Sequence, residues 1–339
     1  LQSPQGSRDI VQTLSRIGHA QEFDGRYEDA DATVHELNAL VERYPFTTTE
    51  DLADHLDQQG RIFTRLGRSS EAEAVLERAL QVLQQGAPSD ASLSTEYANL
   101  GMAKAELGKN DEALAMFTKS VAAARRAFGP NDALLAEKLS PYASMLELVG
   151  RWDDAGEIYR EAIGIRRKVL GPEHPEYAWT LNNYADHLVR RQRYAEAVPL
   201  AREVLALRGK TLPDTNIMVS SAMAVLGRAL GPLGETEEAD RLLHEALDLR
   251  RQNLPAGHWA IASIESMIGA NLTLMKGYDE AESMLVASEQ KLVAARGEGA
   301  PIIADARQRL VDLYTAWGKP EAAERWRRRL PGGRTVVAK

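Results

Sequence analysis

The sequence predicts an all-α fold, a solenoid of about eight helix-turn-helix repeats, and two observations support this prediction. An alanine recurs at a nearly constant spacing along the chain, and apolar residues spaced three and four apart flank a glycine before most of these alanines. The two apolar patterns indicate two amphipathic helices per repeat. One such hairpin cannot bury its apolar side alone, so neighbouring hairpins must stack. We expect a disordered segment at 1–7, the repeats over 8–330, and a basic flexible tail at 331–339.

The alanine column sets the period of the repeat. Its members are Ala30, Ala72, Ala113, Ala155, Ala197, Ala239, Ala281 and Ala323, with successive gaps of 42, 41, 42, 42, 42, 42 and 42 residues. Seven of the eight directly follow an acidic residue. Acids in the first turn of a helix interact favourably with its dipole, so each alanine is expected near the start of the second helix of its repeat.

Other columns keep the same register and have a physical explanation. Twelve residues before each alanine stand Gly18, Gly60, Gly101, Ala143, Ala185, Gly227, Gly269 and Val311, seven of them small, which predicts close approach of the two paired helices. Five residues before the alanine, six repeats have glycine: Gly25, Gly67, Gly108, Gly150, Gly234 and Gly318. A glycine there predicts the end of the first helix, because the residue after a helix often takes the left-handed conformation.

This pattern resembles the tetratricopeptide repeat, in the 42-residue form of kinesin light chains. The stretch that resembles it most runs from Gly171 to Arg208, "GPEHPEYAWTLNNYADHLVRRQRYAEAVPLAREVLALR", and partial linkers recur as "GPNDA" at Gly129 and "PAGHWA" at Pro255. The resemblance implies a right-handed superhelix whose concave face, built by the first helices, binds extended peptide segments of partner proteins. It therefore implies a non-catalytic protein-interaction scaffold.

A second resemblance leaves an alternative open. The stretch "TAWGKPEAA" at Thr315 to Ala323 is similar to the C-terminal repeats of certain bacterial serine/threonine kinases. No kinase motif occurs in this chain, so any kinase domain would lie outside it. The array could then be the regulatory or sensor region of a larger signalling enzyme. Self-association of the array is a third hypothesis.

Composition and charge narrow the classes of partner. The formal net charge is −8, the isoelectric point is about 5.5, and the chain has no cysteine, which removes disulfides and thiolate chemistry. The acidic balance argues against nucleic acid as a partner. No apolar run reaches the roughly 20 residues that a membrane-spanning helix needs, so we expect a soluble protein, with the cytoplasm slightly favoured. Because the chain begins at Leu1 without a signal segment, we expect a piece of a longer protein.

The chain offers no pattern typical of catalysis or metal binding. Its seven histidines never stand three or four apart, the spacing that two metal ligands on one helix face require. No nucleophile elbow and no phosphate-binding glycine loop is present. We therefore expect no catalytic residue, no metal and no cofactor. His174, within the linker motif, is expected to order its turn by hydrogen bonding.

Candidate binding residues follow from the resemblance, which places the fifth, sixth, ninth, twelfth and thirteenth positions of each repeat on the concave face. The ligand contacts predicted there are Arg61, Arg65, Asn99, Asn182, Asn183, Asp186, Arg190 and Arg228. An Asn amide both donates and accepts, so it can hold a peptide main chain, and Arg can fork onto a carboxylate or phosphate. These columns alternate in sign, which favours neither an all-acidic nor an all-basic ligand. For Trp179, also in a groove column, both packing and ligand contact remain open.

Several departures from the pattern make local predictions. Gly231-Pro232 and Pro141 fall within first helices, where proline removes a donor and clashes with the previous turn, so a kink or early helix end is expected at each. Arg307 and Arg327 replace apolar residues in the last repeat, which predicts a polar outer face on a terminal repeat. Four aromatic residues that share one column are expected in the seams between repeats: Tyr27, Trp152, Tyr194 and Tyr278.

Overall fold

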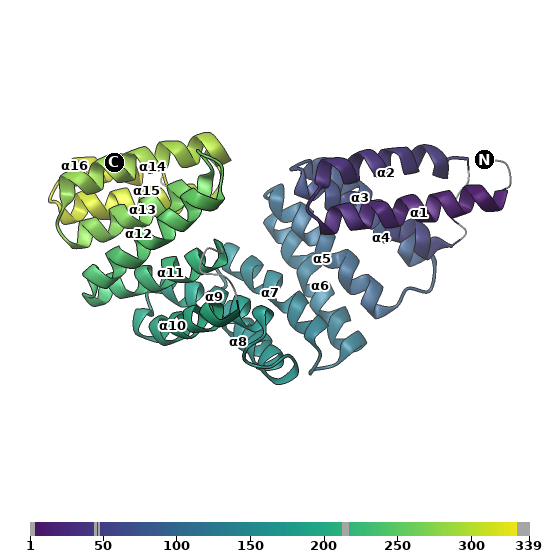
Figure 1. Ribbon diagram of the computed structural model, residues 1–339, viewed down its shortest axis with the longest axis horizontal. Coiled ribbons are helices and arrows are strands. Elements are labelled where there is room, and N and C mark those ends of the chain that lie inside the picture. Colours follow the sequence, from purple (N-terminus) through teal and green to yellow (C-terminus); the bar gives the residue numbers. More distant parts are fainter. Residues whose placement is uncertain (1–3, 44–45, 47, 212–216, 331–339) are drawn as a thin grey trace, which may run out of the picture. The chain divides into compact units, whose positions relative to one another are not determined.

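A computed structural model describes residues 4–43, 46, 48–211 and 217–330, and these fold into α-helices with no β-strand among them (Figure 1). The elements are α1 (Pro4–Phe23), α2 (Tyr27–Val41), α3 (Thr49–Arg65), α4 (Ser69–Gln85), α5 (Asp90–Glu106), α6 (Asn110–Phe128), α7 (Ala133–Leu148), α8 (Trp152–Val169), α9 (Pro175–Arg190), α10 (Tyr194–Thr211), α11 (Ile217–Leu230), the 3-10 turn η1 (Gly231–Leu233), α12 (Thr236–Asn253), α13 (Trp259–Leu274), α14 (Tyr278–Arg296), α15 (Pro301–Ala316) and α16 (Pro320–Arg327). Helix α1 takes in residues 4–7 of the segment expected to be disordered. The predicted tail at 331–339 lies outside the described residues.

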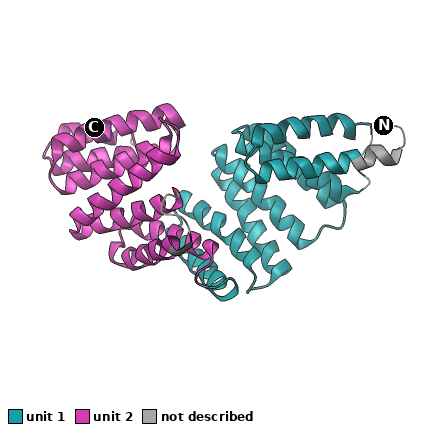
Figure 2. Cartoon of the chain, in the orientation of Figure 1, with its two compact units in different colours: residues 1–171 teal, residues 172–339 magenta. Residues whose placement is uncertain are grey.

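The helices form two compact units, residues 1–171 with α1 to α8 and residues 172–339 with α9 to α16 (Figure 2). Within each unit, an odd-numbered helix pairs with the even-numbered helix that follows it, and each pair packs on the next pair. This arrangement confirms the predicted all-α solenoid of helical hairpins.

The hydrophobic core consists of small clusters shared by neighbouring hairpins. One cluster in the second unit takes residues from four consecutive helices, including Leu188 of α9, Ala201 of α10, Leu226 of α11 and Leu242 of α12. The alanine column lies at the centre of these clusters, because all eight alanines are at most 3% exposed. Since none of the clusters formed by the described residues reaches beyond adjacent hairpins, the stability of each unit rests on nearest-neighbour contacts.

At four glycines of the small-residue column, the space that a side chain would fill is taken by the residue that follows the column alanine by four positions. A Cβ placed on Gly269 of α13 would lie 2.7 Å from Cγ of Leu285 in α14, and one on Gly227 of α11 would lie 2.9 Å from Cγ of Leu243 in α12. Real Cβ atoms do not approach another carbon so closely. The prediction that small residues allow close helix pairing is therefore confirmed.

The helix-ending glycines have the predicted backbone conformation. All six have φ between +72° and +93°. The two repeats that lack glycine at this position place Gln192 and Lys276 there, and these are the two non-glycine residues with positive φ in the described chain, at 58° and 65°. The turn therefore keeps its left-handed geometry even where the side chain disfavours it.

Linker residues cap the first helices. In the second unit, His174 Nδ1 accepts a hydrogen bond from the Glu176 amide at 3.2 Å, and His258 Nδ1 accepts one from the Ala260 amide at the same distance. In the first unit, the Asp132 carboxylate of the "GPNDA" linker caps α7. The predicted role of His174 in ordering its turn is confirmed, and each of these caps satisfies a donor that the helix start leaves free.

The two prolines in first helices have different outcomes. At Gly231-Pro232, helix α11 ends at Leu230 and continues as a 3-10 turn, which confirms the early end. At Pro141 the expectation of an early end is wrong, because α7 runs through the proline to Leu148. Proline removes one backbone bond there, while Leu135 and Leu139 remain fully buried against α6 and α8, and this packing holds the helix.

In the last repeat, the two arginines also differ from each other. Arg327 is exposed and pairs with Glu324 at 2.6 Å, as a polar outer face requires. For Arg307 the prediction of a place on the polar outer face is wrong. Its side chain is only 6% exposed, and it donates to Glu289 at 2.8 Å and also to Glu298. Arg307 is thus an internal link between α14 and α15, since the two carboxylates compensate its buried charge.

Two features add polar links between hairpins. Arg208 and Arg250, one repeat apart, donate from α10 and α12 to the carbonyl oxygens of Met218 and Ala260, which are also one repeat apart. In the aromatic column, Tyr278 stacks on Trp317 of the next repeat and donates to the Ala316 carbonyl. The four aromatic residues of that column are half-buried rather than fully enclosed.

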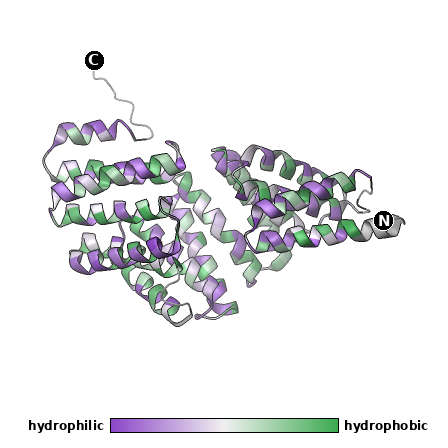
Figure 3. Cartoon of the chain, turned by 45° about the horizontal axis from the view of Figure 1, so that its top comes forward, coloured by the Kyte–Doolittle hydropathy of each residue, from purple (hydrophilic) through white to green (hydrophobic). Residues whose placement is uncertain are grey.

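Hydrophilic and hydrophobic residues alternate along the helices of both units (Figure 3). None of the helices among the described residues combines the length and the apolar character that crossing a lipid bilayer would require.

The helix contact at the small-residue column makes a first prediction. Gly269→Ala should destabilise the protein by about 1–2 kcal/mol, because the collision with Leu285 outweighs the helix propensity that alanine adds. The matched control is Gly164→Ala in α8, where nothing lies within 4 Å, and this change should stabilise by about 0.5–1 kcal/mol. Urea unfolding followed by circular dichroism measures both, and equal shifts in the two variants would contradict the contact.

The left-handed turns make a second prediction. Gln192→Gly or Lys276→Gly should raise the free energy of unfolding by about 0.5–1 kcal/mol, because glycine takes positive φ without strain although it gains entropy in the unfolded chain. The reverse change Gly67→Ala, at φ +74° with open space around it, should lower stability by a similar amount. Thermal unfolding of the three variants checks the sign of each effect.

Candidate ligand-binding groove

In the first unit, two of the three predicted groove residues, Arg61 and Asn99, are bonded to neighbouring side chains. Arg61 pairs with Glu22 at 2.8 Å and with Asp57 at 2.6 Å, and Asn99 donates to Asp57 at 2.5 Å. These bonds connect α1, α3 and α5 across three repeats. Arg65 lies exposed at the end of α3, and no ion pair of the described residues includes it.

A buried carboxyl, Glu96 of α5, lies beside this network. It is 4% exposed, and its Oε1 has no hydrogen-bond partner among the described residues. Burial, and secondly the neighbouring Asp57, raises the pKa of Glu96 to about 9. Burial also raises the pKa of Asp57, against the opposing effects of Arg61 and Asn99. Glu96 is therefore protonated and uncharged at neutral pH. The charges on this face of the first unit are thus compensated by one another.

In the second unit, two of the predicted arginines bind the carboxylate of a third predicted residue, Asp186. Asp186 of α9 accepts from Arg190 at 2.9 Å and from Arg228 of α11. Burial alone would raise the pKa of Asp186, but Arg228 and Arg190 outweigh it and hold that pKa at about 2. Arg190 also reaches Asp305 of α15 at 3.5 Å. Residues from several of the groove columns thus lie together on one charged face, which is formed by the first helices.

The two asparagines of α9 lie one position apart, and their environments differ. Asn182 is 9% exposed, and its Oδ1 has no hydrogen-bond partner among the described residues. Asn183 is half-buried. Trp179, one turn earlier in α9, is 37% exposed, so both the packing and the ligand-contact hypotheses remain predictions.

Sequence reasoning missed the residues that α15 contributes to this face. Arg309 stands 126 residues after Asn183, three full repeats, so it occupies the same column, and Asp312 likewise follows Asp186 by three repeats. Extending the groove columns into the last repeat would have found both. Asp305, which Arg190 contacts, occupies the column of Trp179.

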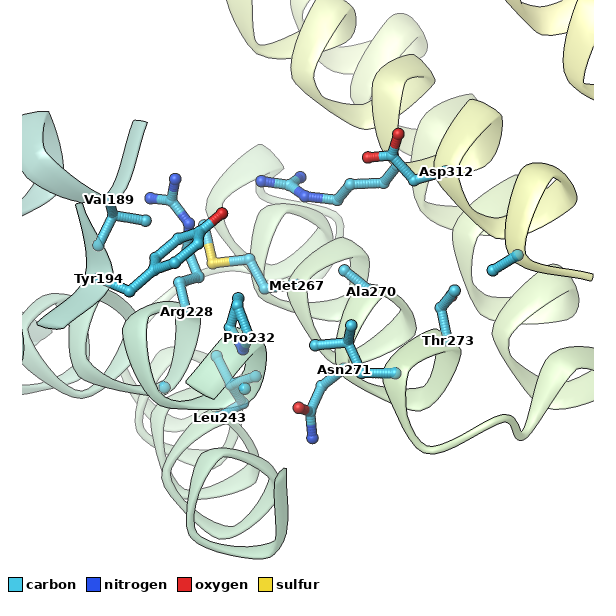
Figure 4. A pocket seen from close by; sticks show the side chains of 15 residues that line it. Val189, Tyr194, Arg228, Pro232, Leu243, Met267, Ala270, Asn271, Thr273 and Asp312 are labelled. Atoms are coloured by element: carbon cyan, nitrogen blue, oxygen red, sulfur yellow. The ribbon is translucent and has the colours of Figure 1, made fainter. Parts of the chain in front are cut away.

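A cavity of about 460 Å³ opens beside these charges, entirely within the second unit. Its lining residues come from six helices and one turn, and they include Val189, Tyr194, Arg228, Pro232, Leu243, Met267, Ala270, Asn271, Thr273, Leu274, Arg309 and Asp312. In Figure 4, Tyr194, Arg228 and Met267 gather at one side of the cavity, and Thr273 and Asp312 lie at the other. The cavity lining thus combines apolar side chains with charged and amide groups, as that of ligand sites commonly does.

A second cavity, of about 330 Å³, shares a wall with the first. Arg228, Met267 and Arg309 line both, and the second cavity adds Arg190, Trp259, Ser263, Arg296, Ala300, Pro301, Ile302 and Asp305. The two cavities therefore form one groove across α9, α11, α13 and α15, divided by the three shared side chains. We call this the α9–α15 groove.

No group of three or more His, Asp or Glu side chains that could hold a metal ion occurs among the described residues. The polar groups of the α9–α15 groove are guanidinium, carboxylate, amide and hydroxyl groups, which suit recognition by hydrogen bonds and ion pairs.

The buried carboxyl of the first unit makes a pH prediction. The folded pKa of Glu96, about 9, lies above the ordinary value of 4.5, so the unfolded chain releases this proton first as pH rises. The wild type should therefore lose stability between about pH 4.5 and 9 relative to Glu96→Gln, by about 1–3 kcal/mol at pH 8. Below pH 4 the ionisation of Glu96 should no longer contribute to a difference in stability between the two proteins. Unfolding curves at several pH values measure the difference, and a pH-independent gap would show that Glu96 ionises normally.

Comparison with known proteins identifies the repeat. Family models described as tetratricopeptide repeat match residues 56–87, 97–133, 134–210 and 219–260, together more than half of the 339 residues. Comparison with curated protein sequences finds no matching protein.

Three solved structures illustrate the similarity in fold. Nearly identical TPR-like repeats assigned to a kinesin light chain of Podosopora anserina align with a TM-score of 0.54 and 21% identity, over 62% of this chain and 100% of that one. A Rap protein complexed with competence and sporulation factor gives 0.64 and 13%, over 96% and 97%. The apo quorum sensor NprR from B. thuringiensis gives 0.66 and 14%, over 94% and 86%. The chain therefore belongs to the tetratricopeptide repeat family, and it shares its fold with the repeats of the Podosopora anserina protein.

Proposed function

We propose that this chain is a non-catalytic protein-interaction scaffold and that its second unit binds an extended segment of a partner protein in the α9–α15 groove. The observation that carries the proposal is the pair of adjoining cavities with a shared charged wall on the face formed by four successive first helices. A groove that crosses several repeats suits a ligand that is long and narrow, because each repeat contributes side chains to one part of it.

The chemistry of the groove suits binding without reaction. The carboxylate of Asp186 is held ionised between Arg190 and Arg228, so it acts as a fixed charge and not as a proton donor near neutral pH. The amides of Asn182 and Asn183 can donate to and accept from a peptide main chain. Apolar side chains of a ligand would fill the two cavities, and burial of their surface would supply most of the binding free energy.

Proteins of similar fold support this class of function. The Rap protein was solved as a complex with competence and sporulation factor, and NprR is described as a quorum sensor. Both fold similarities span most of this chain and most of the other protein. We infer from them the general mode, recognition of a partner by a repeat array, and not the identity of the partner.

The two alternatives from the sequence stay predictions. The hypothesis of a regulatory region within a larger signalling enzyme is tested by the full reading frame of the gene, in which a kinase domain should then be found. Self-association is tested by light scattering at two protein concentrations.

The proposed groove makes a binding prediction. Peptides selected on the immobilised protein from a random-sequence linear display library should bind Asn182→Ala/Asn183→Ala at least several-fold more weakly than the wild type, because the double variant loses the amides that hold a main chain. The matched control is Asn110→Ala at the start of α6, which should leave the affinity unchanged. Isothermal titration calorimetry measures the dissociation constants, and far-UV circular dichroism should show equal helicity in all three proteins.

Each other outcome of this selection has a definite meaning. Selected peptides that bind the double variant as tightly as the wild type would remove the α9–α15 groove as the binding site. A selection that enriches no peptide at all would contradict the proposed function itself.

A further inference from the structure

We infer that the α9–α15 groove recognises a carboxylate, received by Arg309 at the wall between the two cavities, on a peptide with apolar side chains on both sides of that carboxylate. This inference rests on the proposed function and names the chemical class of its ligand. Four observations support it: the bonding of Arg309, the bonding of the other groove arginines, the charges around Arg309, and the apolar lining on either side.

Arg309 has hydrogen-bond donors to spare. Its guanidinium donates through Nη1 to the hydroxyl of Ser266 at 2.9 Å, and no ion pair among the described residues includes it. A guanidinium has five N–H donors and no acceptor, so a single hydroxyl leaves most of its capacity unused. The side chain is half-buried in the groove, and it lines both cavities.

The two neighbouring arginines are already compensated. Arg228 pairs with Asp186, and Arg190 pairs with Asp186 at 2.9 Å and with Asp305 at 3.5 Å. A ligand anion would have to compete with these carboxylates for Arg190 or Arg228. At Arg309 it would replace only a neutral hydroxyl or water, so Arg309 is the favoured position for an incoming charge.

The surroundings of Arg309 disfavour its own positive charge. Burial, and secondly the neighbouring Arg228, lowers the pKa of Arg309 to about 10. A positive charge that is desolvated and near another cation gains most from an added anion. The unliganded groove thus carries an electrostatic cost that a ligand carboxylate would offset.

Two aspartates that line the groove limit the negative charge that a ligand can carry. Asp312 lines the first cavity and Asp305 lines the second, both on the same helix as Arg309. These carboxylates repel a doubly charged group such as a phosphate more strongly than they repel a singly charged carboxylate. The groove therefore fits one carboxylate and disfavours an acidic cluster or a phosphorylated side chain.

Apolar surface flanks Arg309 on both sides. The first cavity offers Val189, Ala270 and Leu274, and the second offers Trp259 and Ile302. Met267 belongs to both linings, and its flexible thioether adapts to different ligand shapes. A peptide that places a carboxylate at the shared wall can fill a cavity on either side with an apolar side chain.

The test uses the peptides selected from the display library, each synthesised in matched forms. In one form Asp or Glu is changed to Asn or Gln, and in another the C-terminal carboxylate is amidated, so the two sources of a carboxylate are separated. On the wild type, one of these changes should weaken binding at least about tenfold, as loss of a charge-assisted bidentate pair does. On Arg309→Gln, the acid and amide forms should bind alike.

Controls separate recognition from folding. Arg241→Gln removes an exposed guanidinium of α12 that pairs with Glu245 outside the groove, and this variant should discriminate acid from amide as the wild type does. Arg309→Lys should restore part of the discrimination, since it keeps the charge but not the forked geometry. Arg309→Gln should keep or raise the melting temperature, because it removes a poorly compensated charge, whereas a purely structural role would lower it.

The outcomes separate this inference from the function on which it rests. If Asn182→Ala/Asn183→Ala weakens the selected peptides but Arg309→Gln discriminates acid from amide like the wild type, the carboxylate site is wrong and the groove stands. Selected peptides without any carboxylate requirement would overturn the inference in the same way. Peptides that ignore both groove variants would overturn the inference together with the groove.

Discussion

The contact between the two helices of a hairpin is the constraint on which the rest of the structure depends. A glycine or alanine of the first helix receives the side chain that follows the column alanine by four residues, as Gly227 receives Leu243. Since this contact and the clusters around it involve only adjacent hairpins, they fix the spacing of the stack and little else. The charged groove residues, such as Asp186, Arg228 and Arg309, belong to none of these apolar clusters, so side chains at such positions can differ from repeat to repeat and carry the specificity.

The sequence was informative where the same physical requirement recurs in every repeat. The left-handed glycines, the buried alanines and the 3-10 turn at Pro232 follow from backbone or packing requirements. In each case the identity of a single residue is enough to indicate the requirement. It was less informative where the outcome depends on a particular neighbour. Proline does not end α7 at Pro141, since packing against α6 and α8 holds that helix, and Arg307 is buried because Glu289 and Glu298 compensate it.

The candidate site shows the same division. The columns predicted which positions share a face, and in the second unit they correctly brought Asp186, Arg190 and Arg228 together. They could not show that these charges pair among themselves, because pairing depends on rotamers and on burial. In the first unit the charges around Asp57 are compensated locally, since Arg61 is bound twice and Glu96 holds its proton, and Arg65 lies outside this network. In both units the face is formed by first helices. The two faces differ in how far their charges are compensated, and therefore in how well they can bind a charged ligand.

The cavity and the poorly compensated arginine of the second unit have a single cause, the composition of α13. Successive repeats place Asp186, Arg228, Ala270 and Asp312 in one groove column, and Asn183, Val225, Met267 and Arg309 in another. Where α9 and α11 supply two opposite charges that bind each other, α13 supplies a small and an apolar residue. Ala270 is too short to bridge Arg228 and Asp312, which leaves the space of the first cavity, and Met267 cannot pair with Arg309. An alanine in an otherwise charged column thus leaves room for a ligand, and an apolar methionine in the preceding repeat leaves Arg309 without an ion-pair partner among the described residues.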